Sequence, residues 1–143
     1  MNLGKIKIEI KGLAPLFQVF DMPTSLHFYR DILGFEFVTG APDSNDDHYD
    51  WVLLKFNEVE FMLNTAYESQ ERPSSPDPAR IAAHEDVSIY FGCPNVDEIY
   101  EILKTKGLNI APPIITHYQY KTLAFHDPDG YNLVFHWPEK PEG

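Results

Sequence analysis

The stretch DMPTSLHFYRDILGF, residues 21–35, has the features of a complete helix with both of its ends. Three candidate N-caps stand near its start: Asp21, Thr24 and Ser25. Pro23 suits the first turn, because its missing N–H group has no helical partner there. Apolar side chains recur at helical spacing, at Leu26, Tyr29, Ile32 and Leu33. Gly34 follows where a left-handed C-cap ends a helix, and Phe35 can pack back on the last turn.

A second stretch, NVDEIYEILKTKGL at residues 95–108, repeats this pattern with its glycine 73 residues later. Asn95 followed by Glu98 is a capping-box pattern, and Gly107 with Leu108 repeats the first helix ending. The apolar stripe consists of Val96, Ile99, Tyr100 and Leu103. A strand pattern precedes each helix, at residues 13–20 and 87–91. The chain therefore carries an internal duplication.

Further strand patterns follow each helix, and turn sequences join them into hairpins. Asn57-Glu58 predicts one hairpin turn, and DPDG at residues 127–130 predicts another. Pro128 presets one turn dihedral, and Gly130 supplies the position with positive φ. We expect these strands at residues 36–39, 51–56, 59–64, 118–125 and 131–137.

These elements predict one α+β domain over residues 1–143, built from two tandem βαβββ modules. Module one is expected at about residues 7–66 and module two at about 86–138. The proline-rich residues 67–85 between them predict a linker with one short helical turn near residues 79–83. Before the first strand, charged residues alternate with Ile6, Ile8 and Ile10, which predicts an amphipathic extended segment.

Composition excludes several classes of partner. The net charge of −11 argues against nucleic acid and anionic membranes, and it is compatible with a cationic or neutral ligand. Cys93 is the single cysteine, so no internal disulfide can form and a reducing compartment is expected. The first residues lack the apolar run of a signal peptide or a membrane span. A cytoplasmic location is therefore expected.

Three segments together resemble the vicinal oxygen chelate superfamily, which includes glyoxalases, bleomycin-resistance proteins, fosfomycin-resistance enzymes and extradiol dioxygenases. They are PLFQVFDMPTSLHFYRDILGFEF, DWVLLKFNEVEFML and LAFHDPDGYNLVF. The most specific parts are S-x-x-F-Y-x-x-x-L-G-F, which begins at Ser25, and the DPDG turn. The resemblance implies that the sheets of the two modules curl into a partly open barrel with the helices outside. It also implies a ligand cleft between the modules and a homodimer.

The resemblance also places four metal-ligand positions, at Ala14, Glu60, Asp86 and Val134. Alanine and valine cannot ligate a metal, so the usual site is expected to be absent and no cofactor is expected. The pattern is closest to metal-free members of the bleomycin-resistance type. One alternative is a shifted divalent-metal site of Glu60, Asp86 and His136, because His136 shares a strand face with Val134. Another is that Glu60 is a polar residue on the solvated face of a hairpin.

Two functions remain open. The first is a protein that binds a drug-like or cationic small molecule without changing it, which needs only a concave apolar site with a few polar groups. Alternation and aromatic character give these candidate ligand-binding residues: Gln18, Trp51, Glu60, Met62, Tyr90, Tyr118, Tyr120, Asn132 and His136. The second is a glyoxalase-like lyase or isomerase. It would use the shifted metal site, or Glu60 and His136 as an acid–base pair.

Overall fold

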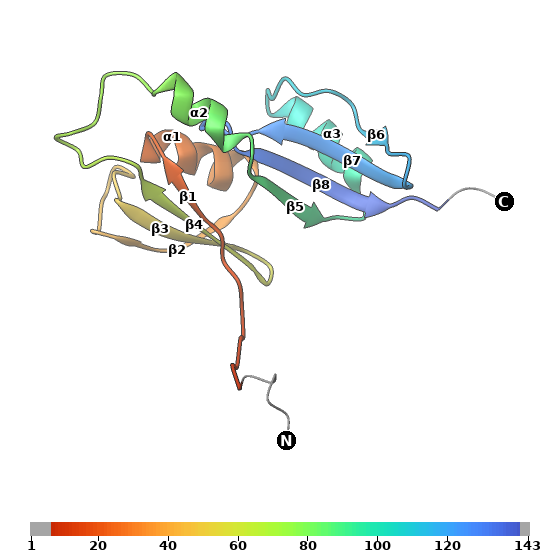
Figure 1. Cartoon of the computed structure of the whole chain (residues 1–143), viewed down its shortest axis with the longest axis horizontal. Coiled ribbons are helices and arrows are strands. Elements are labelled where there is room, and N and C mark those ends of the chain that lie inside the picture. The colour runs from red at the N-terminus through yellow and green to blue at the C-terminus, as the bar shows by residue number, and fades with distance from the viewer. Residues whose placement is uncertain (1–6, 141–143) are drawn as a thin grey trace.

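The computed structural model describes residues 7–140, and its elements follow the predicted duplication (Figure 1). Module one contains β1 (Leu16–Val19), α1 (Met22–Leu26), η1 (His27–Ile32), β2 (Glu36–Ala41), β3 (Trp51–Phe56) and β4 (Val59–Thr65). Module two contains β5 (Ser88–Gly92), α3 (Val96–Thr105), β6 (Ile114–Ile115), β7 (Tyr120–His126) and β8 (Asn132–Pro138). The connecting segment carries α2 (Pro78–His84), which Asp77 caps. Across residues 7–140, no helix has the length and apolar character needed to cross a membrane.

Each module forms its own four-stranded sheet. The strand order is β1-β4-β3-β2 in sheet one and β5-β8-β7-β6 in sheet two. In both sheets the first strand of the module runs parallel to the last one, and the other neighbours are antiparallel. The two sheets therefore share one topology. This confirms the predicted α+β fold of two tandem βαβββ modules with open, curled sheets.

The first helix begins and ends where the sequence predicts, but its second half widens. Asp21 is the N-cap, and its side chain accepts a hydrogen bond from the Thr24 backbone N–H at 3.1 Å. The following η1 segment is π-helical rather than α-helical. Gly34 has a φ of +90°, and the Phe35 N–H reaches back to the Tyr29 carbonyl at 2.9 Å. The glycine therefore closes the helix in the left-handed conformation that only it adopts without strain.

The second helix ends in the same way but starts differently. Gly107 has a φ of +93°, and the Leu108 N–H donates to the Leu103 carbonyl at 3.1 Å. The capping box predicted at Asn95 is wrong, because that side chain accepts no backbone N–H. Asn95 instead donates to the Glu98 carboxylate at 3.4 Å. Its ψ of 50° departs from the extended conformation that a capping residue usually adopts.

Several predicted strand limits need correction. β1 starts at Leu16, and residues 7–15 have no regular structure and extend away from the sheets (Figure 1). Ile6 of the predicted amphipathic segment lies outside the described residues. β7 starts at Tyr120 rather than Tyr118, because Gln119 has a φ of +65° and closes a turn. Pattern analysis missed β6, since a two-residue strand after two prolines shows no periodicity.

Alternation divides each sheet into a core face and an open face. The core faces pack with α1, η1 and α3 into one apolar cluster that spans both modules. Its largest fully buried members include Leu26, Tyr29, Leu54, Phe61, Leu123 and Leu133. The open faces carry the half-exposed and exposed residues of the same strands. Any ligand that meets the sheets from solvent therefore meets the open faces.

The DPDG turn joins the two modules through its buried carboxylates. The Tyr29 hydroxyl donates to Asp127 at 2.6 Å. Asp129 accepts from the Phe20 backbone N–H at 2.8 Å and from the Ser25 hydroxyl at 3.3 Å. Only 5% of Asp127 and 3% of Asp129 are exposed. Charge-assisted bonds of this kind are stronger than neutral ones, so a turn in module two holds the first helix of module one.

Candidate functional site

The open face of sheet one combines amide, apolar and charged side chains. Gln18, Asn64 and Trp51 lie in one row across three neighbouring strands. The Asn64 amide donates to the Gln18 side-chain oxygen at 3.3 Å. The next row contains Leu16, Met62 and Leu53, and the row beyond contains Glu60 and Lys55. The predicted residues of module one therefore share one face, with Glu60 exposed near the hairpin end.

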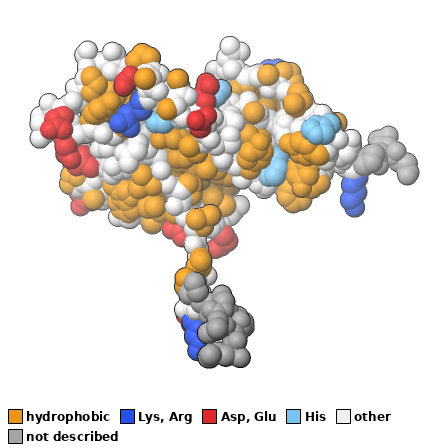
Figure 2. Space-filling view, viewed as in Figure 1, with side chains coloured by type: hydrophobic (Ala, Val, Ile, Leu, Met, Phe, Trp, Pro, Cys, Tyr) orange, Lys and Arg blue, Asp and Glu red, His pale blue; other side chains and the backbone are white. Residues whose placement is uncertain are grey.

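The open face of sheet two, together with the turn that leads into β7, carries a run of rings, which we call the aromatic face: Tyr90, His136, Tyr120 and Tyr118. Ring centroids are 5.0 Å apart for Tyr90 and His136, 5.3 Å for His136 and Tyr120, and 5.6 Å for Tyr120 and Tyr118. Tyr90 and Tyr118 are each 54% exposed. Figure 2 shows histidine side chains set among hydrophobic ones over this sheet. These rings offer flat surfaces to solvent rather than to the core.

Asn132 lies on the same face, beyond Tyr90. Its amide donates to the Ser88 hydroxyl at 2.9 Å, on the neighbouring strand. Val134 lies between Asn132 and His136 on this face, but only 3% of it is exposed. The predicted ligand-binding residues therefore divide between two separate sheets, four on sheet one and five on or beside sheet two.

The alternative metal site is not assembled. Glu60 lies on β4 of sheet one, His136 lies on β8 of sheet two, and Asp86 precedes β5. Among residues 7–140, no three His, Cys, Asp or Glu side chains gather closely enough to hold a metal ion. Within these residues of one chain, Glu60, Asp86 and His136 therefore do not come together as the shifted site requires. Strand alternation gave each of them a face, but it could not show that the faces belong to different sheets.

Glu60 and His136 also do not form the predicted acid–base pair within this chain. No hydrogen bond or ion pair joins them in the described part of the chain. His136 contacts rings instead, with Tyr120 stacked on it and Tyr90 edge-on to it. The surroundings of His136 are therefore those of a stacking surface, which can hold a planar group.

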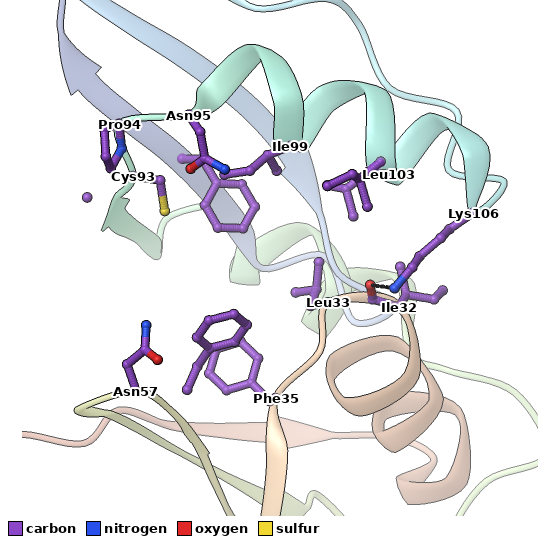
Figure 3. A pocket seen from close by; sticks show the side chains of 14 residues that line it. Ile32, Leu33, Phe35, Asn57, Cys93, Pro94, Asn95, Ile99, Leu103 and Lys106 are labelled. Atoms are coloured by element: carbon purple, nitrogen blue, oxygen red, sulfur yellow. Dashed lines mark hydrogen bonds between the residues drawn. The ribbon is translucent and has the colours of Figure 1, made fainter.

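A cavity of about 410 Å³ lies between the two modules (Figure 3). Module one contributes the end of its first helix and the tip of the β3–β4 hairpin, and module two contributes the β5–α3 loop and α3. None of the predicted ligand-binding residues lines it. Lys106 lies at one end, where its ammonium group donates to the Ile32 carbonyl at 2.9 Å. Cys93 lies at the other end, and burial raises the pKa of its thiol.

Comparison with protein families decides what kind of chain this is. The model of the Glyoxalase/Bleomycin resistance protein/Dioxygenase superfamily matches residues 13–135. The chain belongs to this superfamily. The match spans both modules, from the strand before the first helix to the last strand of sheet two. The resemblance stated from the helix ending and the DPDG turn is thereby confirmed. No curated protein matches the sequence.

Three solved structures show which kinds of protein share this fold. TnmS3, an antibiotic binding protein from Streptomyces sp. CB03234, is 18% identical, with a TM-score of 0.67 over 94% of this chain and 100% of its own. A glyoxalase/bleomycin resistance protein/dioxygenase from Nocardioides is 15% identical, with a TM-score of 0.73 over 99% and 91%. TioX from Micromonospora sp. ML1 is 12% identical, with a TM-score of 0.69 over 90% and 98%. At these identities the likeness shows the fold alone.

Sequence reasoning missed the cavity of this superfamily member for a clear reason. The lining residues come from a helix end, a hairpin tip and a loop that are far apart in the sequence. No periodicity links Phe56 and Asn57 to Cys93 and Asn95. The sequence did contain one indication of it, because two helices that both end at a glycine imply two similar helix ends in the folded domain. This indication does not show where the two helix ends lie or that a cavity separates them.

Proposed function

We propose that this chain binds a planar small molecule on the aromatic face and does not change it chemically. The observation that carries the proposal is the continuous run of Tyr90, His136, Tyr120 and Tyr118 on an open sheet face. Exposed rings in contact with one another lose water-accessible surface when a flat ligand stacks on them. TnmS3, which has a similar fold, is an antibiotic binding protein, and this supports a small-molecule ligand.

The ligand we propose is cationic as well as planar. Tyrosine rings attract cations through their negative faces, and the net charge of −11 favours positive guests at long range. A basic, drug-like compound meets both conditions. Asn132 and Ser88, hydrogen-bonded to each other beside the rings, supply polar groups that can orient such a ligand.

Binding in this proposal needs no divalent metal and takes place in the cytoplasm. Two of the four positions that the family uses for metal ligands carry Ala14 and Val134, which have no donor atom. The side chain of Cys93 is a free thiol, which is compatible with a reducing compartment. The metal claim has a direct check, since a chelator should leave the affinity for the ligand unchanged.

We also propose that two copies of the chain form a homodimer. Ile8, Ile10 and Leu13 are 64%, 79% and 91% exposed on a segment that extends away from the sheets (Figure 1). Exposed apolar side chains grouped in this way are typical of interaction surfaces. Light scattering should give the mass of a dimer, and Ile10→Asp should shift it toward the monomer. Lys11→Asp, on the same segment, should not. A monomeric wild-type protein would rule the dimer out.

Bleomycin, a basic glycopeptide antibiotic, is the first compound to test for the binding function. A ligand that binds only the native state raises the melting temperature by mass action. Tyr90→Ala and His136→Ala should each weaken binding by roughly fivefold, since removing one aromatic contact costs on the order of 1 kcal/mol. Ile115→Ala is the matched control, because Ile115 lies on the opposite face of the same sheet.

The possible results distinguish a wrong binding site from a wrong class of ligand. If bleomycin and a set of planar cations bind with equal affinity to the wild type and to both ring variants, the aromatic face is not the site. If Ile115→Ala weakens binding as much as the ring variants do, sheet two is merely being destabilised and the proposal fails. If none of a set of planar cations binds, the ligand class itself is wrong.

A further inference from the structure

We propose that the cavity between the modules is a second ligand site, one that takes an uncharged, largely apolar molecule with one polar group. Its volume of about 410 Å³ falls in the range of small-molecule sites, roughly 300–1,000 Å³. It is separate from the aromatic face, because neither Tyr90 nor His136 lines it. The proposal does not depend on the function proposed above.

The cavity walls are apolar and held in place by the core. Phe35 and Leu103, which line it from opposite modules, are buried members of the apolar cluster. Leu33, Ile99 and Phe135 pack against that cluster and also line the cavity. Because these side chains are fixed by packing, a ligand would find the walls already formed. Preformed apolar walls lower the cost of ordering on binding.

Two amides supply the polar part of the site. Asn57 and Asn95 line the cavity near the end where Cys93 lies, one on each module (Figure 3). Asn95 does not cap α3, and its side-chain hydrogen bond to Glu98 is long at 3.4 Å. An amide offers both donors and acceptors. The pair therefore suits a neutral polar group such as a hydroxyl or a carboxamide.

The charges around the cavity argue against an ionic ligand. Lys106 is the cationic residue in the lining, and its ammonium group already donates to the carbonyls of Ile32 at 2.9 Å and Asp31 at 3.4 Å. Those carbonyls end a helix, where a cation is stabilised. The Cys93 thiol stays neutral near pH 7, because burial raises its pKa. The lining therefore contains no acidic residue, and its one cation is held at the partly negative end of a helix with two of its N–H donors already used.

Two fluorescent compounds of matched shape test the site. N-phenyl-1-naphthylamine is uncharged, and 8-anilino-1-naphthalenesulfonate adds a sulfonate to the same ring system. The uncharged compound should bind the wild-type protein with enhanced emission and at least about tenfold more tightly than the anion. Saturating amounts of it should also slow the alkylation of Cys93 by N-ethylmaleimide, because Cys93 is the only cysteine and lines the cavity.

Ile102→Trp fills the cavity from its half-exposed rim, and Ile114→Trp places the same side chain on an exposed strand outside it. The first change should weaken binding of the uncharged compound by about tenfold or more, and the second should leave it unchanged. If Ile102→Trp lowers the melting temperature, wild-type protein alkylated at Cys93 serves instead, because the added group also fills the cavity. Equal binding to the wild-type protein and to both filled forms would overturn the proposal. The proposal would also be overturned if Tyr90→Ala, rather than Ile102→Trp, abolished binding of the uncharged compound.

Discussion

Replacement of Asp127 by asparagine should remove a pH dependence that the fold builds into its own module junction. Burial raises the pKa of Asp127 to about 6, although hydrogen bonds from Tyr29 and the Tyr131 backbone act in the opposite direction. The charge of nearby Asp129 raises it further. In an unfolded chain the pKa of an aspartate is about 3.9. The folded protein therefore holds the Asp127 proton more tightly than the unfolded chain does.

This difference in pKa fixes the direction in which stability changes with pH. Below about pH 4 the carboxyl is protonated in both states, and above about pH 6 it is ionised in both. Between these values the folded state binds more protons, so its stability falls as the pH rises. A shift of about two pKa units corresponds to about 3 kcal/mol, of which about 2 kcal/mol is lost between about pH 4.5 and pH 7.5.

Asparagine keeps the shape of the side chain without the ionisation. Its oxygen can accept the two backbone hydrogen bonds that Asp127 accepts now, from Asp129 and Tyr131 at 2.9 Å each. Its amide group can donate to the Tyr29 hydroxyl oxygen. We therefore expect the stability of Asp127→Asn, relative to wild type, to rise by about 2 kcal/mol between about pH 4.5 and pH 7.5.

Urea unfolding followed by tryptophan fluorescence at the two pH values measures this difference directly. Glu101→Gln, which removes an exposed carboxylate on α3, is the control and should follow the wild type at both. The reasoning is refuted if Asp127→Asn and wild type keep a constant difference across the range. It is also refuted if the variant loses stability relative to wild type as the pH rises.

Three further changes test the junction, the turn and the metal claim. Tyr29→Phe should cost about 1–3 kcal/mol, because it leaves an acceptor on Asp127 buried without its 2.6 Å donor; an unchanged urea midpoint would contradict this. Gly130→Ala should cost more than Gly107→Ala, by on the order of 1 kcal/mol or more in urea unfolding. Both glycines have a positive φ, but only at Gly130 would a Cβ meet the Ile81 carbonyl oxygen, at 2.7 Å, so equal costs would refute the clash. Removal of divalent metals with a chelator should leave the melting temperature and the bleomycin affinity unchanged, and a fall in either would contradict a metal-free site.

Much of the fold could be predicted because its decisive features are local. A glycine at the end of an apolar stripe identifies a helix ending from a few residues, and Gly34 and Gly107 both have the positive φ expected of them. Alternation also placed Gln18 and Trp51 on one face, with Asn64 between them. These assignments needed no knowledge of tertiary contacts.

The junction and the cavity could not be predicted, because their partners are distant in sequence. The DPDG pattern predicts a turn, but the side-chain donors to its carboxylates, on Ser25 and Tyr29, lie in module one, and Tyr29 is 98 residues from Asp127. Similarly, the face of His136 was predictable, but its separation from Glu60 depends on how two sheets sit beside each other. The candidate site was therefore predicted in parts and not as an assembly.

The carboxylate turn also breaks the equivalence of the two halves. Module two supplies the acceptors Asp127 and Asp129, whereas the corresponding turn of module one, between β3 and β4, has Asn57 and Glu58 at its tip. Module one in turn supplies the donors, on Ser25 and Tyr29. After such a division of roles, neither half can replace the other. Two copies of module one would bring the donors together without Asp127 and Asp129, so pairing like with like would leave Ser25 and Tyr29 without the acceptors that they have now.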